Sequence, residues 1–359
     1  VGINAMEPAL FGIADGSIIM SWTEPDGTGF AVKTATLQGG NWSRPVTITT
    51  SNSLFVNWAD FPTVAAFNDG TLAVSWLQEN TNIPYAYDIN IALSSDAGQT
   101  WGSPIVPHDD QSTRQHGFLT LLPTERDEMI AVWLDAREYN SQSPGDSFGN
   151  AVQLRSTTIG KDGTLGKDIP LDLRACSCCQ TSAAITEDGT VLIAYRDRTA
   201  DEIRDISIVR RHNGVWSGPV NVHADGWEIS GCPVNGPAID AQATDAVVAW
   251  FTGADNIATI KVAFSEDSGV TFGPAFQVDS GESVGRVGTL MLATGDALIS
   301  WVEWTSDGEV LMLCRATKND GCVARQTITE HAASGSFNFP KLARSGDTIY
   351  LAWTQPIDS

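Results

Sequence analysis

The stretch Ser94–Trp101 reads SSDAGQTW, and the stretch Ser265–Phe272 repeats its pattern as SEDSGVTF. Both fit Ser-x-Asp-x-Gly-x-Thr-aromatic, and both are followed by Gly and a nearby Pro. An Asp and a Gly two residues apart make a tight turn, because the Asp side chain caps local backbone N–H groups and Gly takes a conformation that a side chain would forbid. The aromatic residue then packs the turn against its own sheet. Each stretch therefore predicts a turn of a β-sheet.

Weaker copies of this turn lie at residues 39–45 and 212–219, which keep the aromatic residue and the Pro but lack the Asp. Together the four copies resemble the Asp-box, or BNR repeat, of the sialidase-like β-propellers. The resemblance implies an all-β fold of four-stranded antiparallel blades. It implies little about chemistry, because the Asp-box is a structural turn found in propellers with many functions.

A second repeat is an apolar strand that ends in an aromatic residue. Its copies end at Trp22, Trp76, Trp133, Tyr195, Trp250, Trp301 and Trp353. The spacing is typical of propeller blades, and a turn and another short strand precede each copy. We therefore expect a single β-propeller domain over residues 1–359, with seven blades favoured and six possible. The seventh unit is short, so either it is thin or the Gly2–Met6 segment completes it.

Charge and composition limit the possible partners. The chain has 43 acidic and 21 basic residues, a formal net charge of −22, which repels nucleic acid and anionic membranes and favours solubility. No apolar run approaches ~18 residues, so we expect no membrane insertion. The chain opens at Val1, which suggests a processed N-terminus, and its six Cys fit an extracytoplasmic location, periplasmic or secreted.

Function is expected in the loops on the face opposite the Asp-boxes, because loops carry the binding residues of such scaffolds. We expect these loops to bind a small ligand or a glycan, with an exposed aromatic side chain stacking on a sugar ring. The candidate ligand-binding residues are Trp58, His116, Trp227 and Asn235.

The resemblance also implies a catalytic pattern for a true sialidase: an arginine cluster for the substrate carboxylate, a Tyr nucleophile with a Glu partner, and an Asp acid/base. The stretch Ala5–Leu10 keeps the Pro of the family's Arg-Ile-Pro phrase and lacks its Arg, and Tyr350 lies within a predicted strand. Arg137, Arg198 and Arg286 could supply a cluster. The chain is therefore expected to be a divergent member without the usual sialidase pattern.

Another glycosidase chemistry needs only two carboxylates ~5 to 9 Å apart. The candidates are Asp60, Asp135, Asp197, Asp201, Glu202 and Glu228. The alternative is that these residues are solvated surface groups, or that the Asp-Arg phrases are ion pairs that hold loops.

Four cysteines lie in matching loops of adjacent units: Cys176, Cys178, Cys179 and Cys232. One interpretation is disulfide bonding, as expected outside the cytoplasm. The other is a soft-metal site, for example for copper, to which His116 could contribute. Cys314 and Cys322 flank a turn, where a structural disulfide is expected.

Three functions follow from these features. The first is an extracytoplasmic propeller that binds, and possibly hydrolyses, a glycan or another small ligand. The second is a metal-binding or redox protein built on the four cysteines. The third is a non-catalytic interaction scaffold.

Overall fold

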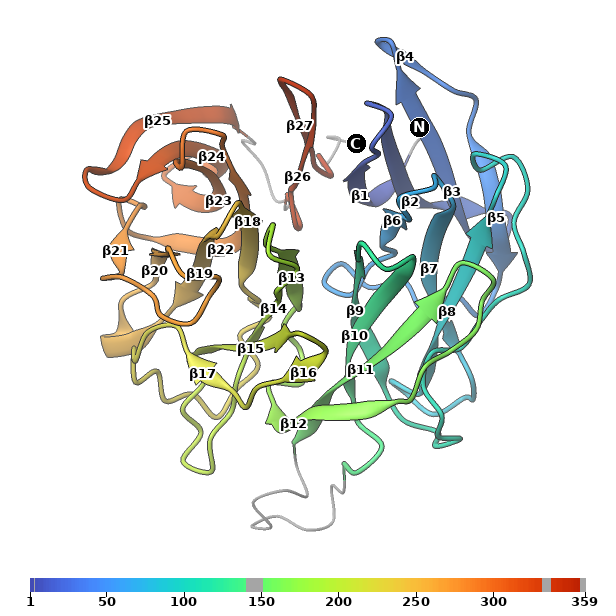
Figure 1. The fold of residues 1–359 in the computed structure, drawn as a ribbon, viewed down its shortest axis with the longest axis horizontal. Coiled ribbons are helices and arrows are strands. Elements are labelled where there is room, and N and C mark those ends of the chain that lie inside the picture. The colour runs from blue at the N-terminus through green and yellow to red at the C-terminus, as the bar shows by residue number, and fades with distance from the viewer. Residues whose placement is uncertain (3, 140–150, 331–336, 356–359) are drawn as a thin grey trace. The chain divides into compact units, whose positions relative to one another are not determined.

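The structure is a computed structural model that describes residues 1–2, 4–139, 151–330 and 337–355. The regular secondary structure of its described part is nearly all antiparallel β-strand, which confirms the all-β prediction (Figure 1). The chain divides into two compact units: Val1–Leu173 with Lys341–Ala352 (unit one), and Arg174–Pro340 with Trp353–Ser359 (unit two). The single domain over residues 1–359 stays a prediction. In the described part, no helix is long and apolar enough to cross a membrane.

The strands of unit one form antiparallel sheets whose members follow one another along the chain. The first sheet contains β1 (Met6–Gly12), β2 (Ile18–Asp26), β3 (Gly29–Gln38), β4 (Asn41–Trp42) and β5 (Val46–Ser51). The second contains β6 (Val64–Ala66), β7 (Leu72–Glu79) and β8 (Tyr87–Ser94). The third contains β9 (His116–Pro123), β10 (Glu128–Asp135), β11 (Val152–Gly160) and β12 (Ile169–Ala175). The last contains β26 (Lys341–Ser345) and β27 (Thr348–Ala352).

Unit two repeats the same sequential pairing. Its first sheet contains β13 (Ser182–Ile185), β14 (Val191–Arg196), β15 (Ile206–His212), β16 (Val215–Trp216) and β17 (Val220–Asn221). The second contains β18 (Ala238–Gln242), β19 (Asp245–Thr252), β20 (Thr259–Ser265) and β21 (Phe276–Gln277), with the short 3-10 helix η1 (Ala254–Asn256) between β19 and β20. The third contains β22 (Ser283–Met291), β23 (Ala297–Thr305), β24 (Gly308–Thr317) and β25 (Gly321–Glu330).

The repeated hairpin signals predict sheets whose neighbouring strands are consecutive in the sequence, as observed. The preference for seven blades over six stays a prediction. The chain start lies against the first sheet: the Gly2 N–H donates to the Glu24 carboxylate of β2 at 3.1 Å. Ile3, in the segment proposed to complete the last sheet, lies outside the described residues.

The second strand of each full sheet lies in the core because its residues are apolar on both faces. Its aromatic residue is almost completely buried, and where that residue is a Trp, the indole N–H needs a partner. Trp22, Trp133 and Trp301 each donate to the carboxylate two residues later, at 2.8 Å. Because residues two apart share one face of a strand, the Trp-x-acid phrase satisfies its own buried polar group.

The two turns that open the sequence argument have matching hydrogen bonds. In the first, Ser94 Oγ accepts from the Gly98 N–H at 2.9 Å, and Asp96 accepts from the Thr100 N–H at 2.9 Å. The corresponding distances in the second, from Gly269 to Ser265 and from Thr271 to Asp267, are 2.9 and 2.8 Å. The central glycines have φ of 82° and 73°, the left-handed conformation that the motif requires.

Candidate functional site

A tight turn before β6 places two of the predicted residues next to each other in unit one. The side chain of Asn57 accepts from the Ala59 N–H at 2.9 Å, and the Asn57 carbonyl accepts from the Asp60 N–H at 3.3 Å. The turn leaves Trp58 42% exposed and Asp60 only 3% exposed. One aromatic side chain thus faces solvent beside a buried carboxyl group.

Two donors hold the Asp60 carboxyl group. The Tyr87 hydroxyl, on β8, donates to Asp60 Oδ2 at 2.9 Å, and the Phe118 N–H, on β9, donates to Oδ1 at 2.7 Å. The approach of β9 depends on Gly117, because a Cβ there would collide with Asp60 Oδ2. Burial is the largest influence on this carboxyl and raises its pKa to about 7, although both hydrogen bonds act in the opposite direction.

Phe118 reaches Asp60 through a β-bulge that recurs in other sheets. Residues 118 and 119 together oppose Trp133, residues 7 and 8 oppose Trp22, and residues 286 and 287 oppose Trp301. The first bulge residue has a φ of 56–57° in each case: Glu7, Phe118 and Arg286. Bulges of this kind redirect a side chain or an N–H group at the end of a strand.

The bulge of β1 supplies a second buried carboxyl group, that of Glu7, which is 4% exposed. Burial is the main reason that its pKa lies well above the usual range, and the neighbouring Asp60 raises it further. Both carboxyl groups therefore retain their protons to a higher pH than an exposed carboxyl group does. Such a pair can donate and accept a proton near neutral pH.

A small pocket adjoins Asp60. Its walls are mainly apolar, with Phe55, Pro62 and Trp76 among the lining residues. Thr23 also lines it, and the Thr23 hydroxyl is buried without a hydrogen-bond partner among the described residues. An apolar wall with a few polar groups is the usual composition of a small-molecule site.

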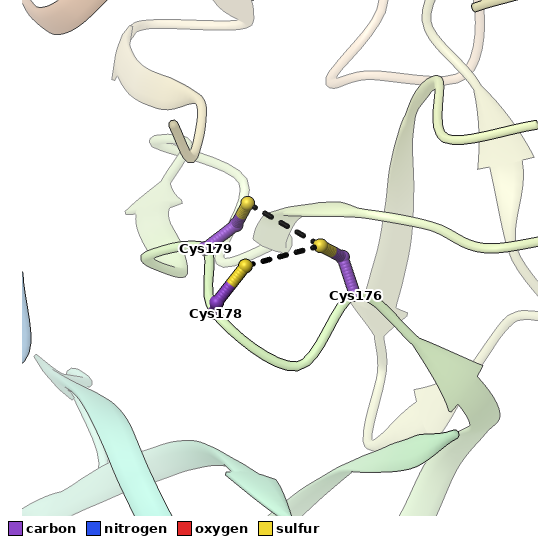
Figure 2. A group of neighbouring side chains, drawn as sticks. All are labelled: Cys176, Cys178 and Cys179. Carbon is purple, nitrogen blue, oxygen red and sulfur yellow. Dashed lines mark hydrogen bonds between the residues drawn. The ribbon is translucent and has the colours of Figure 1, made fainter. Parts of the chain in front are cut away.

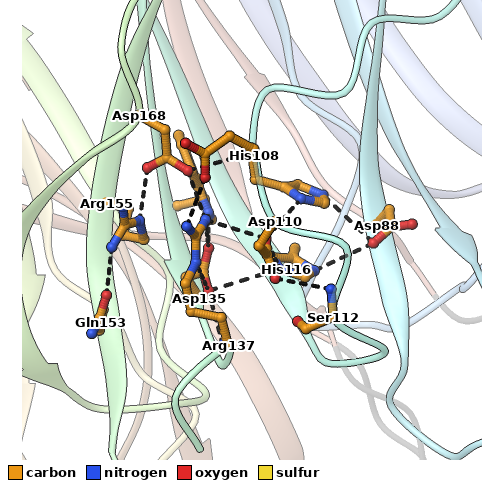
Figure 3. Close-up of polar contacts among 12 residues, drawn as sticks. Asp88, His108, Asp110, Ser112, His116, Asp135, Arg137, Gln153, Arg155 and Asp168 are labelled. Atoms are coloured by element: carbon orange, nitrogen blue, oxygen red, sulfur yellow. Dashed lines mark hydrogen bonds and ion pairs between the residues drawn. The ribbon is translucent and has the colours of Figure 1, made fainter.

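His116, Asp135 and Arg137, predicted as ligand or catalytic residues, lie instead in one ionic network of unit one (Figure 3). Arg137 binds Asp135 and Asp168 at 2.8 and 2.6 Å, as expected if the Asp-Arg phrase holds loops together. The His116 side chain is fully buried, and its Nε2 lies 3.0 Å from Asp110. The His116 ring is therefore not exposed for glycan stacking, and the Asp135 carboxylate is held in an ion pair with Arg137.

The four predicted cysteines come together in unit two. A disulfide joins Cys178 and Cys232, whereas Cys176 and Cys179 are free and buried, with their sulfurs 3.4 Å apart. Figure 2 shows the three sulfurs of the Cys176–Cys179 loop turned toward one another. With two of the four sulfurs in a disulfide, the structure does not present the four-thiolate ligand set. The free pair is the part that could still hold a soft metal.

Charges of unit two surround Cys176. The Arg204 guanidinium donates to Cys176 Sγ at 3.3 Å and pairs with Glu202 at 2.8 Å. The hydrogen bond from Cys179 is the largest influence that lowers the Cys176 pKa, and the charges of Arg204 and Arg196 add to it. Cys176 is therefore the more acidic thiol of the pair, because burial and the adjacent sulfur raise the pKa of Cys179.

Two predicted ligand residues of unit two are structural. Trp227 is 8% exposed and packs under the Arg196 guanidinium, 4.9 Å from the ring centroid, so it cannot stack on a ligand from solvent as expected. Asn235 is also buried, and its Oδ1 accepts from the Arg286 N–H at 2.8 Å. The Arg286 guanidinium is paired with Glu309 at 3.1 Å.

The remaining candidates of unit two stay apart from a shared site. Arg198 pairs with Glu202 at 2.6 Å, and Asp197 accepts from the Ser207 hydroxyl at 2.9 Å. Glu228 and Asp201 are exposed. A disulfide joins Cys314 of β24 to Cys322 of β25 across their turn.

Sequence reasoning missed Glu7 and Tyr87 as partners of Asp60. Glu7 could have been found by its spacing, because it precedes Trp22 by the same interval that separates Arg286 from Trp301. Sequence reasoning also missed Asp88, on β8, and His108, in the loop between β8 and β9, which lie close to His116.

No family model matches the chain, and no curated protein matches it. Several solved structures share its fold. A Hadza microbial sialidase is 17% identical with a TM-score of 0.53, over 84% of this chain and 63% of that one. An α-L-arabinanase of Penicillium chrysogenum is 12% identical with a TM-score of 0.52, over 91% and 94% of the two chains. A polysaccharide lyase, an ulvan lyase, is 13% identical with a TM-score of 0.51, over 90% and 78%.

These likenesses define the class of the fold: the chain is a divergent β-propeller of the sialidase-like kind. It spans 63% of the length of that sialidase.

Proposed function

We propose that this protein binds a glycan and cleaves it at the Asp60 site. The observation that carries the proposal is the buried Asp60 carboxyl group beside Glu7, with Trp58 exposed in the same turn. The fold supports it, since the similar structures include a sialidase, an arabinanase and a polysaccharide lyase. Trp58 would stack on a sugar ring and place the adjacent glycosidic bond at the two carboxyl groups.

The two carboxyl groups take different roles in the proposed reaction. Glu7, the group with the pKa well above the usual range, donates its proton to the glycosidic oxygen as the bond to the anomeric carbon breaks. Asp60, ionised above about pH 7, accepts a proton from the water that attacks the anomeric carbon. Tyr87 and the Phe118 N–H keep the Asp60 oxygens in place during this step.

The substrate that fits this site is a neutral glycan. When the family's Arg-Ile-Pro phrase is aligned on Pro8, Met6 stands where the sialidase resemblance implies an arginine for the substrate carboxylate, and a methionine cannot replace that contact. A formal net charge of −22 also disfavours an anionic substrate. The arabinanase of similar fold is complexed with arabinobiose, a neutral disaccharide.

An extracytoplasmic location, periplasmic or secreted, belongs to this proposal. The Cys178–Cys232 and Cys314–Cys322 disulfides support it, because such bonds persist in oxidising compartments.

The test is incubation of the purified protein with neutral oligosaccharides, including arabino-oligosaccharides, and with a sialyl-oligosaccharide, followed by chromatography of the products. We expect cleavage of a neutral substrate, loss of at least ~100-fold in rate with Asp60→Asn, and little change with Asp201→Asn, an exposed carboxylate of unit two. Release of sialic acid at a rate that Asp60→Asn leaves unchanged would overturn the proposal.

A second candidate function rests on the free thiol pair. Cys176 and Cys179, with sulfurs 3.4 Å apart, would bind a soft metal ion such as Cu(I) through two thiolates. Stoichiometric copper that is lost in Cys176→Ser would support this function. A Cys176–Cys179 disulfide in the native protein, detected by peptide mass mapping, would contradict it.

A further inference from the structure

Five side chains of unit one form what we call the His–Asp cluster: Asp88, His108, Asp110, His116 and Asp135. The imidazole rings of His108 and His116 are parallel within 4°, with centroids 3.8 Å apart. Asp88 comes from β8, His116 from the start of β9, and His108 and Asp110 from the loop between these strands. Figure 3 shows the two rings between the carboxyl groups of Asp88 and Asp110.

One ring nitrogen of each histidine faces Asp88. His108 Nε2 lies 3.5 Å from Asp88 Oδ1, and His116 Nδ1 lies 3.3 Å from the same oxygen. The backbone carbonyl oxygen of Tyr87 is also 3.3 Å from His116 Nδ1. Two nitrogens and a carboxylate oxygen therefore converge within 4.8 Å of one another.

His108 Nε2 is buried and has no hydrogen-bond partner among the described residues. The side chain is only 3% exposed, so water does not replace the missing partner from the surface. A buried polar atom without a partner costs about 1–3 kcal/mol and is rare in native proteins. Something that accepts the lone pair of this nitrogen would remove that cost.

The opposite nitrogens of the two rings share one carboxylate. Asp110 Oδ1 lies 3.2 Å from His108 Nδ1 and 3.0 Å from His116 Nε2. When Asp110 accepts from both N–H groups, the lone pairs of His108 Nε2 and His116 Nδ1 lie on the Asp88 side of the two rings. A carboxylate that fixes the tautomer in this way is the usual outer partner of a metal-binding histidine.

We propose that Asp88, His108 and His116 bind a divalent transition metal ion, with Zn²⁺ the best fit. A tetrahedral zinc ion with bonds of about 2.0–2.1 Å separates neighbouring ligand atoms by roughly 3.3 Å. The two nitrogen-to-oxygen distances at Asp88, 3.3 and 3.5 Å, match that separation. Because the two rings are stacked, one of them must turn for both lone pairs to reach the same ion. Two imidazoles and one carboxylate suit zinc better than Cu(I) or Ca²⁺.

The charge around the cluster favours a cation. In the part of the chain that the structure describes, five carboxylates meet two guanidinium groups, those of Arg137 and Arg155; the carboxylates are those of Asp88, Asp109, Asp110, Asp135 and Asp168. The carboxylates therefore outnumber the guanidinium groups by three when both imidazoles are neutral. A divalent ion offsets most of this excess, and the Asp88 side chain, 27% exposed, provides the path from solvent.

The test is calorimetric titration of the chelator-treated full chain with zinc chloride, in a Cys176→Ser, Cys179→Ser background that removes the competing thiols. We expect one zinc ion per chain and a rise in Tm with zinc. Asp88→Asn and His108→Gln should each weaken binding at least 100-fold, and Asp110→Asn should weaken it 10- to 100-fold. His223→Gln, a histidine of unit two paired with Asp225, is the matched control and should leave binding unchanged.

Two results would overturn the site. One is an absence of zinc binding by the folded chain, with both imidazoles observed by NMR as a protonated pair between Asp88 and Asp110. The other is zinc binding that Asp88→Asn does not weaken. Circular dichroism of each variant distinguishes loss of folding from loss of binding. Asp88 is the most exposed of the three ligands, so we expect its replacement to disturb the fold least.

Discussion

The Tyr87 hydroxyl donates to the Asp60 carboxylate at 2.9 Å, and both side chains are buried. This bond joins β8 to the turn before β6, so the position of the carboxyl group depends on the packing between strands rather than on a mobile loop. The same bond favours the ionised form of Asp60 against the effect of burial. Asp60 can therefore change its protonation near neutral pH while its position stays fixed.

Removing the hydroxyl should shift the titration of Asp60. Tyr87→Phe deletes a donor to the ionised carboxylate, so the Asp60 pKa should rise by roughly one unit. The rising limb of the pH–kcat/KM profile should move to higher pH by the same amount. Tyr85→Phe, at a side chain that is 66% exposed, is the matched control. If the rising limb of the profile does not shift in Tyr87→Phe, the Tyr87–Asp60 hydrogen bond does not control the ionisation on which catalysis depends.

Asp60 should make the folded protein less stable as the pH rises. Its carboxyl group ionises near 3.8 when exposed and near 7 when folded, so between these values the unfolded chain binds fewer protons than the folded one. The cost reaches at most ~4 kcal/mol above that window. Asp60→Asn cannot ionise and should gain stability relative to the wild type from pH 4 to pH 7. Urea unfolding at several pH values measures the difference, and a constant difference would be inconsistent with this pKa.

Gly117 should tolerate no side chain. A Cβ at this position collides with Asp60 Oδ2, so Gly117→Ala should push the carboxylate away and destabilise the fold by about 1–3 kcal/mol. Gly218→Ala is the control, because a Cβ there meets no atom within 4 Å. Thermal unfolding of the two variants provides the comparison. Equal Tm values would show that β9 does not approach Asp60 as closely as described.

The two disulfides should differ in their effect on stability. Cys178 and Cys232 are separated by 54 positions, and Cys314 and Cys322 by 8. The entropy of the unfolded chain predicts losses of ~4 and ~2.5 kcal/mol when each pair is replaced by serines. Chemical unfolding of the two double variants checks the order. A larger loss from the shorter loop would contradict the entropic explanation.

Much of the fold could be predicted from short repeats. The Asp and Gly of the turn at Ser94–Trp101 act through local hydrogen bonds, which sequence spacing determines. The buried Trp of each second strand follows from alternation along the strand, as at Trp133. The bulge opposite that Trp could not be predicted from propensity, because Glu7 and Phe118 adopt a positive φ that their side chains disfavour and that the tertiary contacts impose.

The site was predictable only in part. Trp58 was a candidate as a loop aromatic residue and Asp60 as a loop carboxylate, but their opposite exposure depends on how their shared turn packs. Trp227 was expected at the surface and is buried, since a loop sequence does not reveal that Arg196 covers the ring. Glu7 lies in the stretch Ala5–Leu10, which was considered only because it lacks the family's arginine. The loop that places His108 next to Asp88 has no sequence signature.

The central claim is that Asp60 and Glu7 act as base and acid on a neutral glycan. The most direct measurement is the pH dependence of kcat/KM on the best neutral oligosaccharide, for the wild type and for Asp60→Asn. We expect the wild-type value to rise with pH to a midpoint of about 7, where Asp60 ionises, and the variant to lose both the activity and the rise. A variant that keeps the wild-type rate and profile would contradict the account.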